Sequence, residues 1–389
     1  MITVAEALDR LFTLVAPLGI EEVPLTEAAG RVLARAVAAT RDQPPFAASA
    51  MDGYAIADTP APGVRLRLIG EAAAGHGFNG RVGAGEAVRI FTGAPVPEGT
   101  TRVVMQEDVT RDGKAITLGD RIGPKDNIRP AACDFHAGQV MTAPRRLRPA
   151  EIALLAAMNV AVVPVRRRPQ VALIATGDEL VMPGDTPGPD QIIASNAFGL
   201  KALFEAQGAK ARLLPIARDT RASLETALGL AEGCDLVITI GGASVGDHDL
   251  VARLGPELGL ERAFYKVAMR PGKPLMAGRM GAAAMVGLPG NPVSAMVCGQ
   301  VFVAPMIDAM LGLGKAPAPR LTARLAAPLP ANGPREHYMR ARLSEAGIKA
   351  EDKQDSSLLS ILAHADALLV RPPDDPAREA GEMVEYLPV

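Results

Sequence analysis

The sequence predicts a multidomain α/β protein whose largest domain is a doubly wound, mostly parallel sheet. The chain has 389 residues, too many for one compact core, so we expect roughly two to four domains. Residues 168–314 alternate strand-like and helix-like segments, the pattern of a mostly parallel sheet. Residues 60–140 consist of short apolar pieces broken by glycine, which predicts a separate β-rich module.

Composition argues against several classes of protein, namely nucleic-acid binders, disulfide-rich or zinc proteins, and membrane-spanning proteins. The net charge of -2 argues against a nucleic-acid binder that works by bulk charge. Cys133, Cys234 and Cys298 are far apart and lack CxxC spacing, which argues against disulfides or zinc and favours a reducing cytoplasm. The N-terminus has no basic segment followed by an apolar run, and no apolar span reaches roughly 18 residues. We therefore expect neither a signal peptide nor a membrane span.

The N-terminal segment is predicted to be helical. Apolar residues recur at helical spacing, at Val4, Leu8, Phe12 and Val15. Thr3 and Glu6 have the spacing of a capping box. We expect helix over residues 1 to about 40 and again over 148–160, with the β-rich module inserted between two helical segments that pack together.

The α/β segment divides into five strands and four helices. The predicted strands are 171–175, 210–216, 235–240, 264–268 and 283–287, and the predicted helices are 196–207, 220–232, 248–258 and 292–311. A Pro/Ala/Gly linker follows, and residues 320–389 predict a small β module with strands at 338–343 and 367–371.

Polar, glycine-bearing turns follow every predicted strand of the α/β segment. In chain order they read TGDEL, ARDT, GGASVGDHD, MRPGKP and GLPGNPVS. Ligands bind at the carboxyl ends of the strands in an open parallel sheet. If the strands are parallel, these turns share one edge, and that edge is the predicted site.

Acidic side chains recur in these turns, at Asp178, Glu179, Asp219, Asp247 and Asp249. For any single acid, a helix cap or a turn is the more common role. Five of them among glycine loops and cations favour a bridging Mg²⁺, which prefers oxygen ligands.

Two further turns have groups that suit an anion. Gly241, Gly242, Ser244 and Gly246 form either a phosphate-binding loop or only a tight turn. Lys266, Arg270 and Lys273, around Pro271, form either a grip for an oxyanion or a solvated basic surface. Ser294 lies in the first turn of a predicted helix, where an anion is favoured, although a well-capped buried helix has the same pattern.

The inserted module has its own polar loops, with Asp52, Thr92, Glu107, Asp108 and Asp134. From the residues alone, these are acidic loops without an assigned role. The five histidines lack the HxxxH and HExxH spacings, and the chain has no GxSxG, so a zinc enzyme and a serine hydrolase are both unsupported.

Six motifs occur together in one order: SAMDGYA, FTGAPVPEG, TGDEL, GGASVGDHD, KVAMRPGKP and GLPGNPVSA. In order and spacing, this set resembles the molybdopterin molybdenumtransferase family, which includes the C-terminal domain of gephyrin. The resemblance spans essentially the whole chain. It implies a split helical domain (1–43 and 140–167), an inserted β-rich domain (44–139), an α/β molybdopterin-binding domain like that of molybdopterin adenylyltransferases (168–314) and a C-terminal β barrel (315–389).

The resemblance also implies an activity, in which molybdate is inserted into adenylylated molybdopterin with Mg²⁺-dependent release of AMP. It implies a homodimer whose cleft lies between the α/β domain of one subunit and the β domain of the other. A separate molybdopterin adenylyltransferase would supply the substrate, and molybdoenzymes or their chaperones would accept the product. We expect no nucleic-acid or membrane partner.

Site residues follow from the same resemblance. Positions implicated in activity match Asp52, Thr92, Asp134, Glu179, Asp219 and Asp249, of which Asp219, Asp249 and Glu179 are the expected Mg²⁺ ligands. Positions that bind substrate match Gly241, Gly242, Ser244, Gly246, Lys266, Arg270, Pro271, Lys273, Ser294, Arg340 and Ser356, with Ser357 as an alternative to Ser356. Arg270 stands where the family often has lysine, so the charge is kept but the geometry changes. An adenylyltransferase and a non-catalytic assembly protein are the alternative functions.

Overall fold

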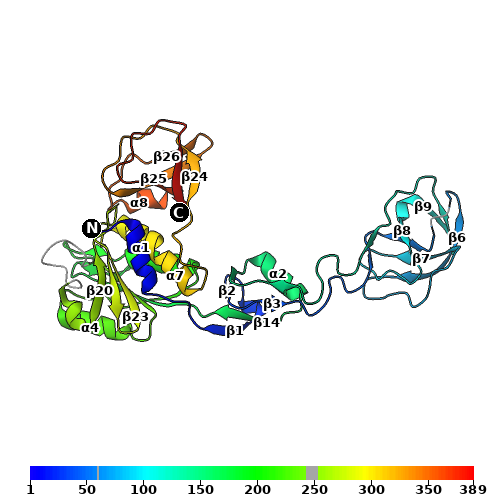
Figure 1. Ribbon diagram of the computed structural model, residues 1–389, viewed down its shortest axis with the longest axis horizontal. Coiled ribbons are helices and arrows are strands. Elements are labelled where there is room, and N and C mark those ends of the chain that lie inside the picture. Colours follow the sequence, from blue (N-terminus) through cyan, green and yellow to red (C-terminus); the bar gives the residue numbers. More distant parts are fainter. Residues whose placement is uncertain (59–60, 242–252) are drawn as a thin grey trace. The chain divides into compact units, whose positions relative to one another are not determined.

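The structure is a computed structural model that describes residues 1–58, 61–241 and 253–389 (Figure 1). These residues form two compact units. The first unit comprises Met1–Glu21, Gly30–Ala34 and Val165–Val389, and the second comprises Glu22–Ala29 and Arg35–Pro164.

A six-stranded sheet forms the centre of the first unit, in the order β18-β15-β19-β23-β22-β20. Its strands are β15 (Gln170–Ala175), β18 (Lys210–Leu213), β19 (Leu236–Ile240), β20 (Leu260–Tyr265), β22 (Met276–Met280) and β23 (Ala283–Leu288). β15 pairs in parallel with β18 and β19, and β19 pairs in parallel with β23. The prediction of a mostly parallel sheet is confirmed. The sheet is mixed, however, because β22, which was not predicted, is antiparallel to both of its neighbours.

The direction of β20 follows from β22. β20 and β23 are both antiparallel to β22, so they run the same way as each other. One row of paired residues, Tyr265, Met276, Gly287 and Thr239, crosses the sheet near its carboxyl edge. The turn between β20 and β22 therefore opens at the same edge as the turns after β15, β19 and β23.

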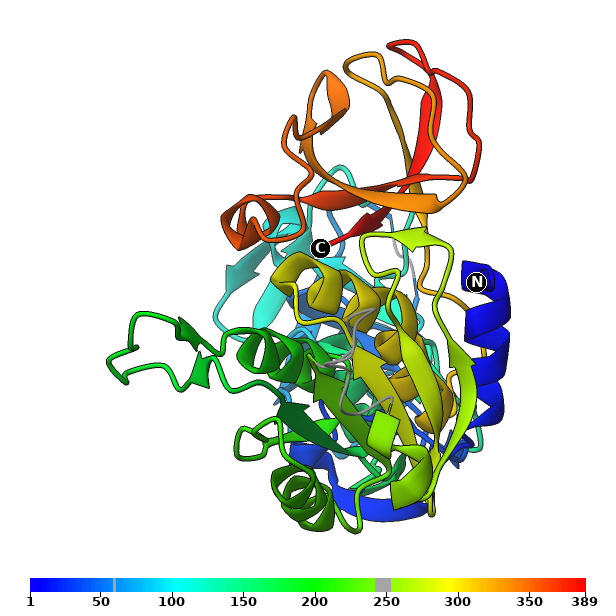
Figure 2. The ribbon, with the colours of Figure 1, turned by 90° about the vertical axis from the view of Figure 1, so that its left-hand side faces the viewer.

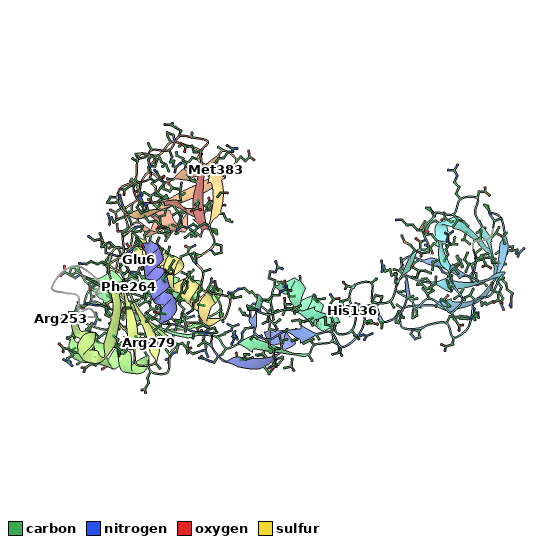
Figure 3. All side chains as sticks on the ribbon, in the orientation of Figure 1. Glu6, His136, Arg253, Phe264, Arg279 and Met383 are labelled. Atoms are coloured by element: carbon green, nitrogen blue, oxygen red, sulfur yellow. The ribbon has the colours of Figure 1, made fainter. Side chains whose placement is uncertain are left out.

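Helices cover both faces of this sheet (Figures 1 and 2). They are α1 (Val4–Thr13), α3 (Asn196–Ala206), α4 (Arg221–Leu230), η3 (Pro256–Leu258), α6 (Pro292–Cys298), the π-helical η4 (Gly299–Val303) and α7 (Ala304–Met310). On one face Phe204 and Phe302 pack with sheet residues such as Val286. On the other face Leu224 of α4 packs on Ile174. Phe264, labelled in Figure 3, belongs to the first of these cores.

The continuous helical stretch Pro292–Met310 is apolar and 19 residues long, which would suffice to cross a membrane by length and composition. In the described part of the chain it is the only such stretch, and 83% of its apolar window is buried inside the protein. It is therefore a core helix of the α/β sheet.

α1 belongs to the core of the first unit. Its capping box is confirmed, because Glu6 N donates to Thr3 Oγ1 and Thr3 N donates to Glu6 Oε2. The apolar face of α1, including Leu11, packs on α7 and β20. The helix predicted at 148–160 is α2 (Pro149–Ala157) of the second unit. The part of the N-terminal segment that packs on it is Leu25–Glu27.

The C-terminal part of the first unit is a curled half-barrel, where the sequence analysis expected a complete barrel. Its elements are β24 (Leu321–Arg324), β25 (Glu336–Ser344), β26 (Gly347–Ala350), α8 (Leu359–Ala363), β27 (Ala367–Arg371) and β28 (Met383–Pro388). Both predicted strands are confirmed as β25 and β27. A short strand from the α/β segment, β21 (Met269–Arg270), pairs with β25 and so joins the half-barrel to the sheet domain.

The second unit is built on a six-stranded sheet in the order β8-β5-β7-β6-β10-β9, which confirms the β-rich module. Its strands are β5 (Gly53–Ile56), β6 (Arg65–Ala72), β7 (Glu86–Ile90), β8 (Arg102–Met105), β9 (Val109–Asp112) and β10 (Ala115–Leu118). Smaller pairs join β4 (Ala48–Ser49) to β11 (Ile128–Arg129) and β3 (Val37–Ala38) to β12 (Val140–Met141). The short helices η1 (Leu25–Glu27) and η2 (Gln106–Asp108) complete the unit.

The prediction of continuous helix up to residue 40 is wrong beyond α1. The segment instead contributes β1 (Ile20–Pro24) and β2 (Val32–Leu33) to a four-stranded sheet with β13 (Arg145–Arg146) and β14 (Val162–Arg166). These strands pair with residues more than a hundred positions away, for example Leu33 with Val165. Local helical propensity is overridden by such distant pairing. The four domain boundaries of the sequence analysis stay a prediction.

Two matched substitutions test the separate cores. Leu11 of α1 and Leu155 of α2 are both fully buried. Leu11→Ala should destabilise the first unit by about 2–5 kcal/mol, because it leaves a cavity in that core. Leu155→Ala should do the same to the second unit. Hydrogen exchange, followed separately in each unit, measures both effects, and equal loss of protection in both units for either variant would contradict this assignment.

Candidate active site

A cavity of 470 Å³ lies at the carboxyl edge of the sheet. It is lined by the turn after β15, by Asp219, by Gly241 at the end of β19, by Pro274 before β22 and by the turn that leads into α6. The convergence predicted from the five polar turns is therefore confirmed for their described residues. A two-stranded ribbon of β16 (Leu180–Val181) and β17 (Ile192–Ile193), which extends from this edge in Figure 2, forms another wall.

The two adjacent acids after β15 have different surroundings. Asp178 Oδ1 accepts a hydrogen bond from the backbone N–H of Asp219 at 3.0 Å, so this carboxylate ties two turns together. Glu179 lines the cavity. Its carboxylate folds back over Gly177, where an added Cβ would lie 2.7 Å from Glu179 Cδ. Glycine at 177 thus leaves the space that the Glu179 carboxylate fills.

Gly241 permits two strand ends to approach closely. Its φ of +100° is in the region that favours glycine, and an added Cβ would lie 2.6 Å from the carbonyl oxygen of Thr176. Both Thr176 and Gly241 line the cavity. A side chain at 241 would therefore push apart the ends of β15 and β19 where the cavity begins.

Carboxylates on the cavity fit part of a Mg²⁺ site. Glu179 and Asp219 both line it and offer the oxygen ligands that Mg²⁺ prefers. Among the residues that the structure describes, no group of three His, Cys, Asp or Glu is arranged to hold a metal ion. The remaining predicted residues of this region, Gly242, Ser244, Gly246, Asp247 and Asp249, lie outside the described residues. The assignment of Glu179, Asp219 and Asp249 as ligands stays a prediction.

The predicted cationic residues Lys266, Arg270 and Lys273 have different surroundings. Lys266 lies with its Nζ 4.9 Å from the centre of the Tyr265 ring, a cation–π contact. Arg270 is exposed and pairs through β21 with His337 of the half-barrel. Pro271 is buried, whereas Lys273 is exposed. Arg270 is thus the member of the set that adjoins the half-barrel.

A loop of the half-barrel closes on the start of α6. Asn291 Nδ2 donates to Ser356 Oγ at 3.0 Å, and Val293 N donates to the carbonyl oxygen of Ser356 at 3.0 Å. Ser294, in the same turn of helix, is buried with 4% exposure. Because Ser356 Oγ accepts from Asn291, its own proton is available to another acceptor. The structure therefore brings the predicted residues Ser294 and Ser356 to the same helix start.

Arg340 lies fully buried behind this loop. Its Nη2 donates to the carbonyl oxygens of Lys353 and Asp355, at 3.1 and 2.9 Å. Within the described part of the chain, Nε and Nη1 of Arg340 are buried without a hydrogen-bond partner. Burial lowers the pKa of Arg340 from its usual value, yet an arginine stays charged. A charged group with two unused donors is suited to bind an anion.

His337 is a buried residue of this region that the sequence analysis did not select. It is 7% exposed, and its Nε2 is also without a partner among the described residues. Burial, followed by the charges of Arg270, Arg340, Arg335 and Arg371, lowers the pKa of His337 to about 4. The imidazole is therefore neutral near pH 7.

The second unit has a polar cluster of its own. Asp52 Oδ1 accepts hydrogen bonds from Thr92 N at 2.8 Å and Thr92 Oγ1 at 2.7 Å, which lower the pKa of the Asp52 carboxyl below its usual value. Arg89 lies over the rings of Tyr54 and Phe91 and donates to the carbonyl oxygen of Gly53. Sequence reasoning predicted Asp52 and Thr92 as site residues, and the structure brings them together. Asp134 is an exposed loop residue with a backbone hydrogen bond to Gln43.

Other residues of the sites escaped sequence reasoning because their roles are non-local. Arg218 donates to three carbonyl oxygens of the turn after β15, and Asn196 Nδ2 donates to the carbonyl oxygen of Gly290 at 2.6 Å. The signal for Arg218 was its position in ARDT, directly before Asp219. Nothing in the local sequence indicated Asn196, Arg89 or His337.

A cavity at the carboxyl edge of a mostly parallel sheet, with carboxylates on its wall and a buried guanidinium nearby, defines an enzyme site for an anionic ligand. Comparison with known proteins identifies the family within this class of enzyme. The family description "MoeA N-terminal region (domain I and II)" matches residues 2–159, "Probable molybdopterin binding domain" matches 172–309, and "MoeA C-terminal region (domain IV)" matches 322–389.

Full-length relatives agree with these matches. A molybdopterin molybdenumtransferase of Nostoc is 36% identical over 415 residues, covering 100% of this chain and 94% of the relative. One of Haemophilus influenzae is 37% identical over 318 residues, covering 80% and 78%. The crystal structure of the molybdopterin biosynthesis MoeA protein of Pyrococcus horikoshii OT3 superposes with a TM-score of 0.85 at 27% identity, over 100% of both chains. The chain belongs to the MoeA family of molybdopterin molybdenumtransferases, enzymes that insert molybdenum during molybdenum cofactor biosynthesis.

Two glycine substitutions test the close approach of β15 and β19. Gly241→Ala should destabilise the first unit by at least about 1 kcal/mol, because the new methyl group meets Thr176 at a strained φ. Gly229→Ala, in α4 with nothing within 4 Å of its added Cβ, should instead stabilise by about 0.5–1 kcal/mol. Urea unfolding measures both, and destabilisation by both substitutions would show that the Thr176 contact is not the cause.

His337 predicts a pH dependence of stability. In the unfolded chain His337 is protonated below its ordinary pKa of 6.5. In the folded chain it stays neutral until the pH falls to about 4. The stabilisation is therefore complete above about pH 6.5 and is lost as the pH falls toward 4. Between about pH 7 and about pH 5 the loss should be on the order of 2 kcal/mol.

Urea unfolding at these two pH values compares the natural chain with His337→Gln. The variant should lose most of this pH dependence, because it has no group that takes up the proton. An unchanged dependence in His337→Gln would assign the effect to other groups.

Proposed function

We propose that this enzyme inserts molybdate into adenylylated molybdopterin and releases AMP in a Mg²⁺-dependent step. The observation that carries the proposal is the Arg340 guanidinium, which is fully buried yet has two donors without a partner among the described residues. A buried charge left in this state is costly unless a ligand completes it. Molybdate, a tetrahedral dianion, is suited to the charge-assisted hydrogen bonds that an arginine donates.

Nearby groups support an oxyanion in this place. Arg270 lies on β21, which pairs with β25, the strand that carries Arg340. Ser356 Oγ has a proton to give, since it accepts from Asn291. Ser294 lies in the first turn of a 19-residue helical stretch, where the helix dipole favours negative charge. We therefore assign Arg270, Ser294, Arg340 and Ser356 to molybdate.

The cavity supports binding of the adenylylated part of the substrate. Backbone groups of Gly177 and Gly241 approach it without side chains, which suits a phosphate. Glu179 and Asp219, with Asp249 from the resemblance, would hold Mg²⁺. When bound, the ion would polarise the phosphoanhydride that is broken. The protein's own task is then to hold the anhydride beside these carboxylates and to keep molybdate at the far end.

The assembly and location of the enzyme form a further part of the proposal. The resemblance supports a cytoplasmic homodimer that receives its substrate from a molybdopterin adenylyltransferase and passes the product to molybdoenzymes or their chaperones. Asp52, Thr92 and Asp134 would contribute to activity in that assembly. Sedimentation of the purified chain tests the homodimer, and a monomer at micromolar concentration would overturn that part of the proposal.

The reaction itself is tested with purified protein and adenylylated molybdopterin. AMP release is followed with Mg²⁺ present, with and without molybdate, and the product is assayed by activation of an apo-molybdoenzyme. Release that requires both ions, together with active cofactor, supports the proposal. Tight substrate binding without AMP release would overturn it, and AMP transfer from ATP to molybdopterin would indicate the adenylyltransferase alternative.

Arg340 gives a sharper prediction for the molybdate end. Arg340→Ala removes two charge-assisted hydrogen bonds, each worth about 1.5–3 kcal/mol, so the KM for molybdate should rise at least roughly tenfold. Arg340→Lys keeps the charge but loses the guanidinium donors. Its KM for molybdate should therefore lie between those of the natural chain and of Arg340→Ala. The KM for adenylylated molybdopterin should change much less.

Arg342→Ala is the matched control, because Arg342 lies on the same strand and pairs with Glu351 at the surface. It should leave both KM values near those of the natural chain. An Arg340→Ala enzyme that is folded and has an unchanged KM for molybdate would place the anion elsewhere.

A further inference from the structure

In the turn after β15, the carbonyl oxygens of residues 177–180 all accept hydrogen bonds. Arg218 Nη1 donates to the carbonyl oxygens of Gly177, Asp178 and Leu180, at 3.4, 2.9 and 3.0 Å. The fourth carbonyl oxygen, that of Glu179, accepts from Ile192 N at 2.8 Å. One arginine nitrogen thus gathers three of these oxygens, and the ribbon strand β17 holds the other.

A second set of contacts fixes this turn to the turn that contains Asp219. Gly177 N donates to the carbonyl oxygen of Ala217 at 3.1 Å, and Asp219 N donates to Asp178 Oδ1 at 3.0 Å. Arg218 N donates to Ser223 Oγ at 2.9 Å, which anchors the arginine backbone at the start of α4. The two turns are therefore interlocked, with Arg218 between them.

The interlocked turns present two carboxylates to one cavity. Glu179 and Asp219 both line it, and the Glu179 carboxylate lies over Gly177, whose carbonyl oxygen is one of those that Arg218 holds. The guanidinium of Arg218 itself is not part of the cavity lining. Its bonds are to backbone oxygens, so its effect on the cavity must pass through the turn.

We infer that Arg218 is a positioning residue for Glu179: it fixes the backbone of residues 177–180 so that the Glu179 carboxylate faces the cavity beside Asp219. The inference rests on the proposed function, in which Glu179 acts on the bound substrate. This role explains why the exposed Arg218 donates to backbone oxygens at this edge of the sheet. It also explains the two adjacent acids, since Asp178 locks the turns and Glu179 alone reaches the cavity.

The test compares Arg218→Met, Arg218→Lys, Glu179→Gln and the double variant Arg218→Met with Glu179→Gln. Arg218→Met has similar length but no donors, so the turn should loosen and Glu179 should lose its place. A displacement of about 1 Å in a reacting group can cost roughly a hundredfold in rate, so kcat for AMP release should fall roughly tenfold to a hundredfold. KM for the substrate should change less than about threefold, because Arg218 does not contact the cavity.

Arg218→Lys should recover part of kcat, because an ammonium group also offers several donors around one nitrogen. The double variant should be no slower than Glu179→Gln alone, because a residue that acts only through Glu179 has nothing to add once that carboxylate is gone. A purely structural role would give additive losses and no such rescue.

Arg212→Met is the matched control. Arg212 lies on the strand that leads to Arg218, and its Nη2 donates to the carbonyl oxygen of Leu230 at the other end of α4. The same substitution there should leave kcat unchanged. Hydrogen exchange supplies a measurement independent of activity: the amides of Asp219 and Ile192, which donate into the turn, should exchange faster in Arg218→Met only.

Arg218→Met with the kcat of the Arg212→Met control, beside a slow Glu179→Gln, would overturn this inference alone. A penalty that adds fully to that of Glu179→Gln would also overturn it. Full activity of Glu179→Gln would overturn the role of Glu179 in the proposed function, and the positioning role with it.

Discussion

The common direction of β15, β19, β23 and β20 determines where the chemistry of this enzyme can lie. Parallel pairing brings the ends of β15, β19 and β23 to one edge, and two successive antiparallel pairings return β20 to the same direction. Turns that are up to about a hundred residues apart in sequence therefore line one cavity. Reversing any one of these strands would move its polar turn to the opposite edge, away from the others.

A second constraint comes from the half-barrel. β21 leaves the α/β segment to pair with β25, which brings Arg270 beside His337. The loop that carries Ser356 contacts the start of α6. The buried Arg340 holds the loop that carries Ser356 through the carbonyl oxygens of Lys353 and Asp355. The half-barrel thus supplies a buried guanidinium with two unpartnered donors among the described residues, the group on which the proposed molybdate site rests. Burial first, and then the charges of the neighbouring arginines, lower the pKa of His337 there.

Long apolar strands and capped helices were predictable from sequence, and short strands were not. β15, β19 and β23 are continuous buried runs followed by glycine turns, so local pattern sufficed. β1 and β2 are short, and their pairing partners lie far along the chain, so an alanine-rich segment was mistaken for helix. Site prediction divides in the same way. Glu179 and Asp219 were found from their turns, whereas Arg218 and Asn196 bond to residues between 38 and 94 positions away. Only the place of Arg218 in ARDT was a local signal, and His337 had none.

The central claim is that the buried guanidinium of Arg340 is one end of a molybdate site beside the carboxyl edge of the sheet. Anomalous diffraction from crystals of the protein soaked in molybdate tests it most directly, because the molybdenum signal locates the anion without any assumption about activity. The account predicts a peak within hydrogen-bonding reach of Nε or Nη1 of Arg340, close to Ser356. A peak at a different place in the protein, with the Arg340 donors still unmet, would contradict it.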